Sequence, residues 1–292
     1  MERKENEYKK QRWIYAAVGV MVLLLAGMVY AWSVLSSPIG AYFPEWSKAQ
    51  LSLTFTICMG FFCVGGFLGG LANKKINVKL HVWASGVVFF VGFFIASRAQ
   101  SPAVLYLGYG VLCGFASGLV YNAVMSTISG WFPDKQGLVS GLLLMGFGIS
   151  SFIVGKIYQA VTPSGVGIDA WRNSFFYVRY HYSGRYGCQR LFLCKADEAG
   201  YRENPGWGTV RKIKFRRKTA AGAEAEASVD MTAVEMVKTR AFWLYFAWAV
   251  LLSAAGLALI SQASGVASEV GRGVDPGTIA TVVGLISIFN GI

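Results

Sequence analysis

The sequence has little charge, little histidine and none of the motifs that mark common enzymes. Only 14% of its 292 residues are charged, whereas a soluble domain carries about a quarter. It contains no GxSxG, no HExxH and no glycine-rich phosphate loop, so we expect it not to be an enzyme. Its two histidines lie far apart and its five cysteines lack metal-ligand spacing. We therefore predict no metal site and no cofactor.

Apolar residues and glycine dominate the composition instead. The chain is 54% hydrophobic, contains 35 glycines and has a mean hydropathy of +0.47, which predicts an all-α, polytopic membrane protein surrounded by a lipid bilayer. The formal net charge is +12, but the Lys and Arg residues lie in short loops between apolar runs, where they orient membrane spans. We expect no nucleic acid as a partner, and no obligate protein partner is evident.

Seven apolar stretches are predicted to be membrane helices, at about 13–36, 51–72, 80–97, 104–130, 137–161, 242–264 and 278–292. The first is expected to end at Pro38. Five Lys or Arg residues precede it within residues 1–12, and the positive-inside rule then places the N-terminus in the cytoplasm of a cell-membrane protein. The loops at 73–79 and 131–136 should be cytoplasmic and the loop at 41–48 should be outside. The last stretch has only about 15 residues, fewer than a span requires, so we expect a fragment.

One region interrupts this pattern. Trp171 begins what resembles a sixth span, but from Tyr177 the chain becomes polar, and eleven Lys or Arg residues follow between Arg179 and Lys218. Five spans would place these cations outside, against the positive-inside rule. If the codons from Tyr177 onward are read one base later, the genetic code permits an apolar sequence long enough for a span. Our hypothesis is therefore a frameshift over about 177–208, and the alternative is a genuine polar, disordered or re-entrant segment.

The predicted organisation is a first-half bundle at 1–176, a disrupted span and cytoplasmic central loop at 177–239, and the start of a second half at 240–292.

The glycines of the fourth and fifth stretches are regularly spaced. Gly110, Gly114 and Gly118 recur every four residues, while Gly141 and Gly148 are seven residues apart. Each series therefore lies on one helix face. A helix face made of small residues lets the backbone of a neighbouring helix approach closely in lipid. We therefore predict that neighbouring helices pack against these five glycines. The alternative is that glycine is simply frequent in spans.

Few polar side chains lie within the spans, and Tyr121 and Asn122 are the clearest of them. Tyr121 lies about 15 Å along the helix from Trp131, near the bilayer midplane. Polar groups at this depth usually face a bundle interior or a cavity, and transporters place their substrate sites there. For Tyr121 the alternative is a structural hydroxyl bonded to a neighbouring helix. Tyr30 and Trp32 lie in the far half of the first span, and for these two residues the alternative is an aromatic belt at the outer interface.

Four segments resemble a known family: the run from Gly110 to Tyr121, WFPDKQGLVSGLLLMGFG at 131–148, YAWSV at 30–34 and WRNSFF at 171–176. They are similar to the oxalate/formate antiporter family of the major facilitator superfamily. The resemblance covers nearly the whole chain except about 177–218, and it is weaker at 73–79, where Asn73 stands in place of the superfamily's usual acid.

The resemblance implies twelve spans in two halves and exchange of small carboxylates by alternating access. It also implies that Tyr30 and Tyr121 line the substrate cavity. Asn122, which follows Tyr121 in the sequence, is predicted to contact substrate because it is polar. The family's cavity cations belong to the second half, so we expect the chain as written to be inactive. A proton-coupled monocarboxylate transporter of the same superfamily and a non-transporting membrane protein or decayed gene product remain alternatives.

Overall fold

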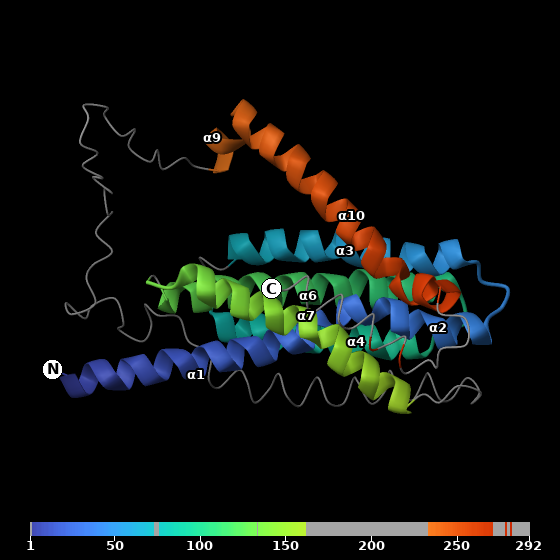
Figure 1. The fold of residues 1–292 in the computed structure, drawn as a ribbon, viewed down its shortest axis with the longest axis horizontal. Helices are drawn as coiled ribbons and strands as arrows, with labels where there is room; N and C mark the ends of the chain where they lie inside the picture. The colour runs from blue at the N-terminus through green and yellow to red at the C-terminus, as the bar shows by residue number, and fades with distance from the viewer. Residues whose placement is uncertain are drawn as a thin grey trace. The chain divides into compact units, whose positions relative to one another are not determined.

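The computed structural model describes residues 2–72, 76–132, 134–161 and 233–270, together with Thr278 and Thr281. Every element within these ranges is helical, which confirms the predicted all-α class (Figure 1). Among the described residues, five helices are long and apolar enough to cross a membrane, namely Gln11–Ala31, Lys48–Ala72, Val78–Ser97, Pro102–Trp131 and Arg240–Leu259. The interrupted sixth span, the hypothetical frameshift over 177–208 and nearly all of the stretch at 278–292 lie outside the described residues.

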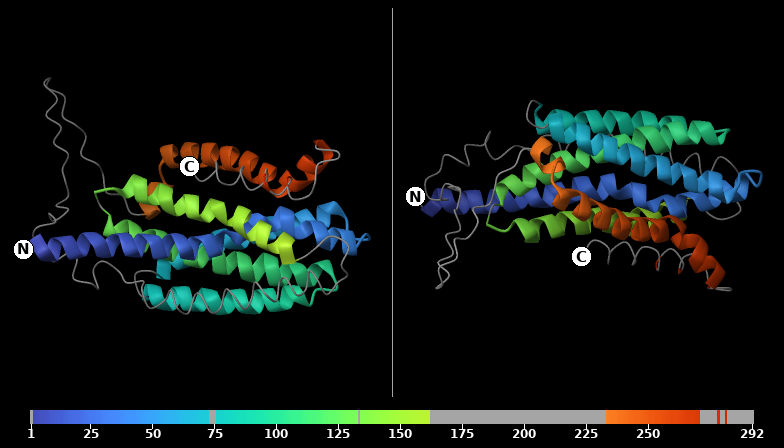
Figure 2. Two further views of the ribbon diagram at one scale, coloured as in Figure 1. Left: turned by 60° about the horizontal axis from the view of Figure 1, so that its bottom comes forward. Right: turned by 90° about the horizontal axis from the view of Figure 1, so that it is seen from above.

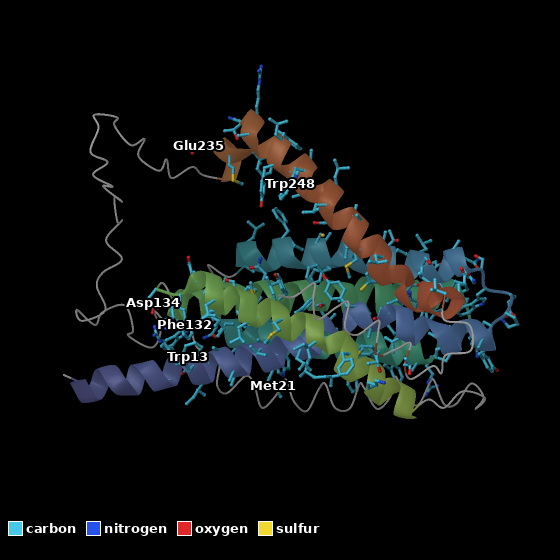
Figure 3. All side chains as sticks on the ribbon, in the orientation of Figure 1. Trp13, Met21, Phe132, Asp134, Glu235 and Trp248 are labelled. Atoms are coloured by element: carbon cyan, nitrogen blue, oxygen red, sulfur yellow. The ribbon has the colours of Figure 1, made fainter. Side chains whose placement is uncertain are left out.

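The chain divides into two units. The first, Met1–Tyr201 with Ile260–Ile292, contains these elements: α1 (Glu2–Ala26), η1 (Gly27–Ala31), α2 (Trp32–Tyr42), α3 (Lys48–Ala72), α4 (Val78–Ser97), α5 (Pro102–Leu105), η2 (Tyr106–Cys113), α6 (Gly114–Trp131) and α7 (Gln136–Val161). The second, Arg202–Leu259, contains α9 (Ala233–Val237) and most of α10 (Arg240–Val270). Within it, the indole N–H of Trp243 donates to the Val237 carbonyl at 2.8 Å, and Trp248 is exposed (Figure 3).

Capping residues fix where the spans of the first unit begin. Ser47 and Gln50 form a capping box before α3: the Gln50 N–H donates to the Ser47 hydroxyl at 3.2 Å, and the Ser47 N–H donates to the Gln50 side chain at 2.9 Å. The side chain of Asn77 accepts from the Lys79 N–H at 2.9 Å at the start of α4. Pro102 occupies the first position of α5, where its missing N–H removes no helical hydrogen bond.

The helices of the first unit run side by side (Figures 1 and 2), with α3 packed on α6, and with α1 packed on α7 and α6. Helices α3 and α6 contact each other directly through backbone atoms. A Cβ atom added to Gly114 would overlap the Cys58 carbonyl oxygen, and one added to Gly118 would overlap the Phe62 carbonyl oxygen. Because no side chain larger than hydrogen fits there, these two glycines set the spacing between α3 and α6.

The other glycines predicted to pack have different surroundings. A Cβ atom on Gly110 would lie 2.9 Å from Cγ2 of Ile57, and Gly148 is buried. At Gly141 a Cβ atom would meet no atom of the described chain within 4 Å. The close approach of α7 to α1 lies instead at Gly146, where a Cβ atom would be 2.7 Å from Cγ1 of Val20. A seven-residue spacing does not by itself reveal which side of α7 faces a neighbour.

The first span is not the continuous helix that its sequence predicts. It changes from α-helix to 3₁₀-helix over Gly27–Ala31 and resumes as α2. Breaks of this kind in a membrane helix require other partners for the backbone. The Ser117 hydroxyl donates to the Ala26 carbonyl at 2.7 Å, and the Tyr109 hydroxyl donates to the Met28 carbonyl at 3.2 Å. These two side chains, from α6 and from the π-helical segment η2, therefore stabilise the break.

The C-terminal part of the first span differs from the predicted end at Pro38. Helix α2 continues through Pro38 to Tyr42. A proline removes one N–H donor, and membrane helices tolerate this where neighbours compensate. Trp32 is not a belt residue at a lipid surface. It is buried, its N–H donates to the Leu51 carbonyl at 3.0 Å, and its ring lies 4.7 Å from that of Tyr109.

Candidate functional site

Four aromatic side chains from four different elements meet inside the first unit. They are Tyr30 of η1, Phe62 of α3, Tyr121 of α6 and Phe147 of α7, here called the ring cluster. Phe147 lies at its centre: its ring centroid is 5.2 Å from that of Tyr30, 5.3 Å from that of Tyr121 and 6.0 Å from that of Phe62. Phe62 and Tyr121 are 5.5 Å apart. The cluster thus connects the first, second, fourth and fifth helices of the predicted bundle.

Close backbone packing holds the rings in place. A Cβ atom on Gly27 would overlap the Phe147 carbonyl oxygen, so the glycine allows η1 and α7 to approach each other just before Tyr30. Gly118 does the same for Phe62, whose carbonyl it contacts. Phe147 is 3% exposed, whereas Tyr30, Phe62 and Tyr121 are half-buried. The cluster therefore has a buried centre and a partly accessible rim.

The hydroxyl groups distinguish the cluster tyrosines from Tyr106 and Tyr109, which lie in the same bundle. Tyr109 donates to Met28, and Tyr106 donates to the Gln50 carbonyl at 3.0 Å. Neither Tyr30 nor Tyr121 has a hydrogen-bond partner among the residues that the structure describes. A hydroxyl in an apolar setting costs free energy if it stays unpaired. Two such groups on one rim are suited to donate to a ligand that bears oxygen.

Asn122, the third polar residue predicted to contact substrate, has a different position from the rings. Its amide lies against Gly70 near the Ala72 end of α3, where a Cβ atom on Gly70 would be 3.4 Å from Nδ2. Phe62 lies eight residues earlier on the same helix, about 12 Å along its axis. Substrate contact by Asn122 stays a prediction.

The ring cluster is uncharged. An isolated carboxylate in such a setting loses its hydration without compensation, which costs many kcal/mol. A carboxylate ligand held by these tyrosines would therefore need a cation from another part of the protein. No group of three or more His, Cys, Asp or Glu residues that could hold a metal occurs within the described ranges.

Sequence reasoning found the two tyrosines but missed both phenylalanines. It selected polar groups within apolar spans, and a phenylalanine in a span has no unusual composition. A signal for Phe147 was nevertheless present. Tyr121 lies ten residues before Trp131, where α6 ends, and Phe147 lies eleven residues after Gln136, where α7 begins. Because both helices rise about 1.5 Å per residue, the two rings lie at about the same distance from the loop that joins the helices. Phe147 is also flanked by Gly146 and Gly148.

Comparison with known proteins supports this architecture. The family model described as Major Facilitator Superfamily matches residues 17–178, which include the whole ring cluster. An uncharacterized MFS-type transporter of Escherichia coli (strain K12), YhjX, is 23% identical over 285 residues, covering 98% of this chain and 65% of that protein. The oxalate:formate antiporter of Oxalobacter formigenes is 24% identical over 283 residues, covering 96% of this chain and 61% of that protein.

A shorter similarity connects the chain to another group of transporters. Monocarboxylate transporter 13 of Rattus norvegicus is 28% identical over 155 residues, covering 53% of this chain and 35% of that protein. The chain spans less than two thirds of the length of each of these relatives.

Proposed function

Because the chain belongs to the major facilitator superfamily, a family of multi-pass membrane transporters and not of enzymes, we propose that it takes part in the secondary transport of small carboxylates by oxalate/formate-type exchange. The observation that carries this proposal is the ring cluster, in which Tyr30 of η1 and Tyr121 of α6 both pack on the Phe147 ring and neither hydroxyl has a hydrogen-bond partner among the described residues. The similarity to an oxalate:formate antiporter over 96% of the chain supports the choice of substrate class.

In this proposal the hydroxyls of Tyr30 and Tyr121 donate hydrogen bonds to carboxylate oxygens. A hydrogen bond to a charged acceptor contributes more than a neutral one, about 1.5–3 kcal/mol. Phe62 and Phe147 hold the tyrosine rings at fixed spacing, and the compensating cation comes from outside the ring cluster. Alternating access would then expose the rim to each side of the membrane in turn.

A second candidate is proton-coupled transport of monocarboxylates. The similarity to monocarboxylate transporter 13 favours it, and so does the half-buried phenyl ring of Phe62, which offers apolar surface to an organic tail. Oxalate has no such tail.

Proteoliposomes containing the purified protein separate these candidates. Because the described residues supply no cation to the ring cluster, we expect the 292-residue chain to give no oxalate exchange by itself. When a second half that supplies this cation is present with it, we expect labelled oxalate to enter vesicles loaded with formate in a saturable manner and to enter empty vesicles slowly. Lactate uptake that responds to an inward proton gradient, without oxalate exchange, would favour the monocarboxylate reading instead. If neither flux exceeds that of protein-free liposomes even with the second half present, both candidates are contradicted and a non-transporting membrane protein is favoured.

The proposed orientation places the α6–α7 loop in the cytoplasm and the loop before α3 outside. Lys135 and Glu45 are exposed residues of these loops, so cysteines at the two positions should react differently with a membrane-impermeant maleimide. In sealed cells we expect labelling above the unsubstituted background for Glu45→Cys but not for Lys135→Cys, and labelling of both after permeabilisation. The reverse pattern would invert the predicted topology.

A further inference from the structure

Arg12, near the start of the first span, is buried although it carries a charge. It is 5% exposed, and its Nη1 donates to Oδ1 of Asp134 at 2.9 Å across 122 residues of sequence. Asp134 lies between α6 and α7 and is 38% exposed. A cation that only orients a span is expected to stay in water. The burial of Arg12 therefore indicates a specific structural contact.

Aromatic rings surround this ion pair. The guanidinium carbon of Arg12 lies 4.8 Å from the centroid of the Phe132 ring, within cation–π distance. Trp13 contacts the same ring edge-on at 5.0 Å, and the rings of Tyr15 and Trp131 are 4.7 Å apart. Figure 3 shows Trp13, Phe132 and Asp134 gathered beside α1. The start of the first span thus touches the end of α6 and the loop that follows it.

We propose that Arg12, Phe132 and Asp134 form an end clamp that locks the start of the first span to the α6–α7 hairpin, so that α1, α6 and α7 move as one body at this end of the bundle. The loop itself is a tight turn, in which the Lys135 N–H donates to the Phe132 carbonyl at 3.2 Å. Loss of Asp134 would remove a charged partner from a buried cation, which is more costly than loss of an exposed pair. The clamp is independent of the substrate that the ring cluster binds.

Hydrogen exchange on the purified full chain, resolved by peptide, tests the clamp. Asp134→Asn should accelerate amide exchange in residues 131–140 and 12–20 by about tenfold, because local opening becomes easier when the loop is released. Arg12→Gln should do the same. Lys135→Gln is the matched control, since it removes a neighbouring charge from the same loop at an exposed position, and it should leave exchange unchanged.

The double variant Arg12→Gln/Asp134→Asn decides whether the two residues act together. If they form one clamp, the double variant should exchange no faster than either single variant, because the second change removes an interaction that is already lost. Effects that multiply in the double variant would overturn the proposal, as would equal acceleration by Lys135→Gln. If Arg12→Gln does not fold, Asp134→Asn alone still tests the clamp, and unchanged exchange in residues 12–20 would overturn it.

Discussion

Replacing Gly118 by leucine should lower the free energy of unfolding by about 1–3 kcal/mol, the usual cost of forcing extra atoms into a packed interior. The new Cβ atom would overlap the Phe62 carbonyl oxygen and would lie 2.8 Å from the Gly66 nitrogen. Both neighbours are backbone atoms, so a change of rotamer cannot relieve the overlap. Helices α3 and α6 would have to separate, and Phe62 would move with α3 away from the ring cluster.

Gly130→Leu provides a matched control on the same helix. A Cβ atom at Gly130 meets nothing within 4 Å in the described chain, so this variant should melt close to the unsubstituted protein. The measurement is the loss of helical circular dichroism on heating in detergent. Equal melting temperatures for Gly118→Leu and Gly130→Leu would show that α3 and α6 are not in backbone contact.

Removing one cluster hydroxyl should weaken carboxylate binding by about tenfold or more. Tyr121→Phe keeps the ring that packs on Phe62 and Phe147 and deletes only the proposed donor. A hydrogen bond to a charged acceptor contributes about 1.5–3 kcal/mol, and 1.4 kcal/mol corresponds to a factor of ten in affinity. The apparent affinity for oxalate in the exchange assay measures this effect, while the melting temperature should hardly change. Tyr30→Phe should behave similarly.

Tyr106→Phe is the control for this pair. Its hydroxyl donates to the Gln50 carbonyl, so its loss should reduce stability modestly and leave the affinity for substrate unchanged. Tyr121→Phe could instead resemble Tyr106→Phe, with lower stability and unaltered affinity. In that case the Tyr121 hydroxyl has the alternative role, that of a structural group bonded to a neighbouring helix.

The sequence determined the class of this protein by local properties. Low charge, long apolar runs and basic loops predict membrane helices because hydropathy is a property of each segment alone. Local signals also mark where α3, α4 and α5 begin, at Ser47, Asn77 and Pro102. The four-residue spacing of Gly110, Gly114 and Gly118 predicted a smooth face on the fourth span, because the helical repeat fixes which residues share a face.

Only the tertiary structure decided which faces meet. Nothing local distinguishes Gly27 from the other glycines of the chain, yet the Phe147 carbonyl lies against it and the first span breaks there. Phe62 and Phe147 contact Tyr30 and Tyr121 across 26 to 117 residues of sequence, and Arg12 reaches Asp134 across 122. Such contacts depend on the rotation of each helix about its axis and on its choice of neighbour. Both are set by packing between helices, because lipid surrounds every apolar face with an equally apolar solvent.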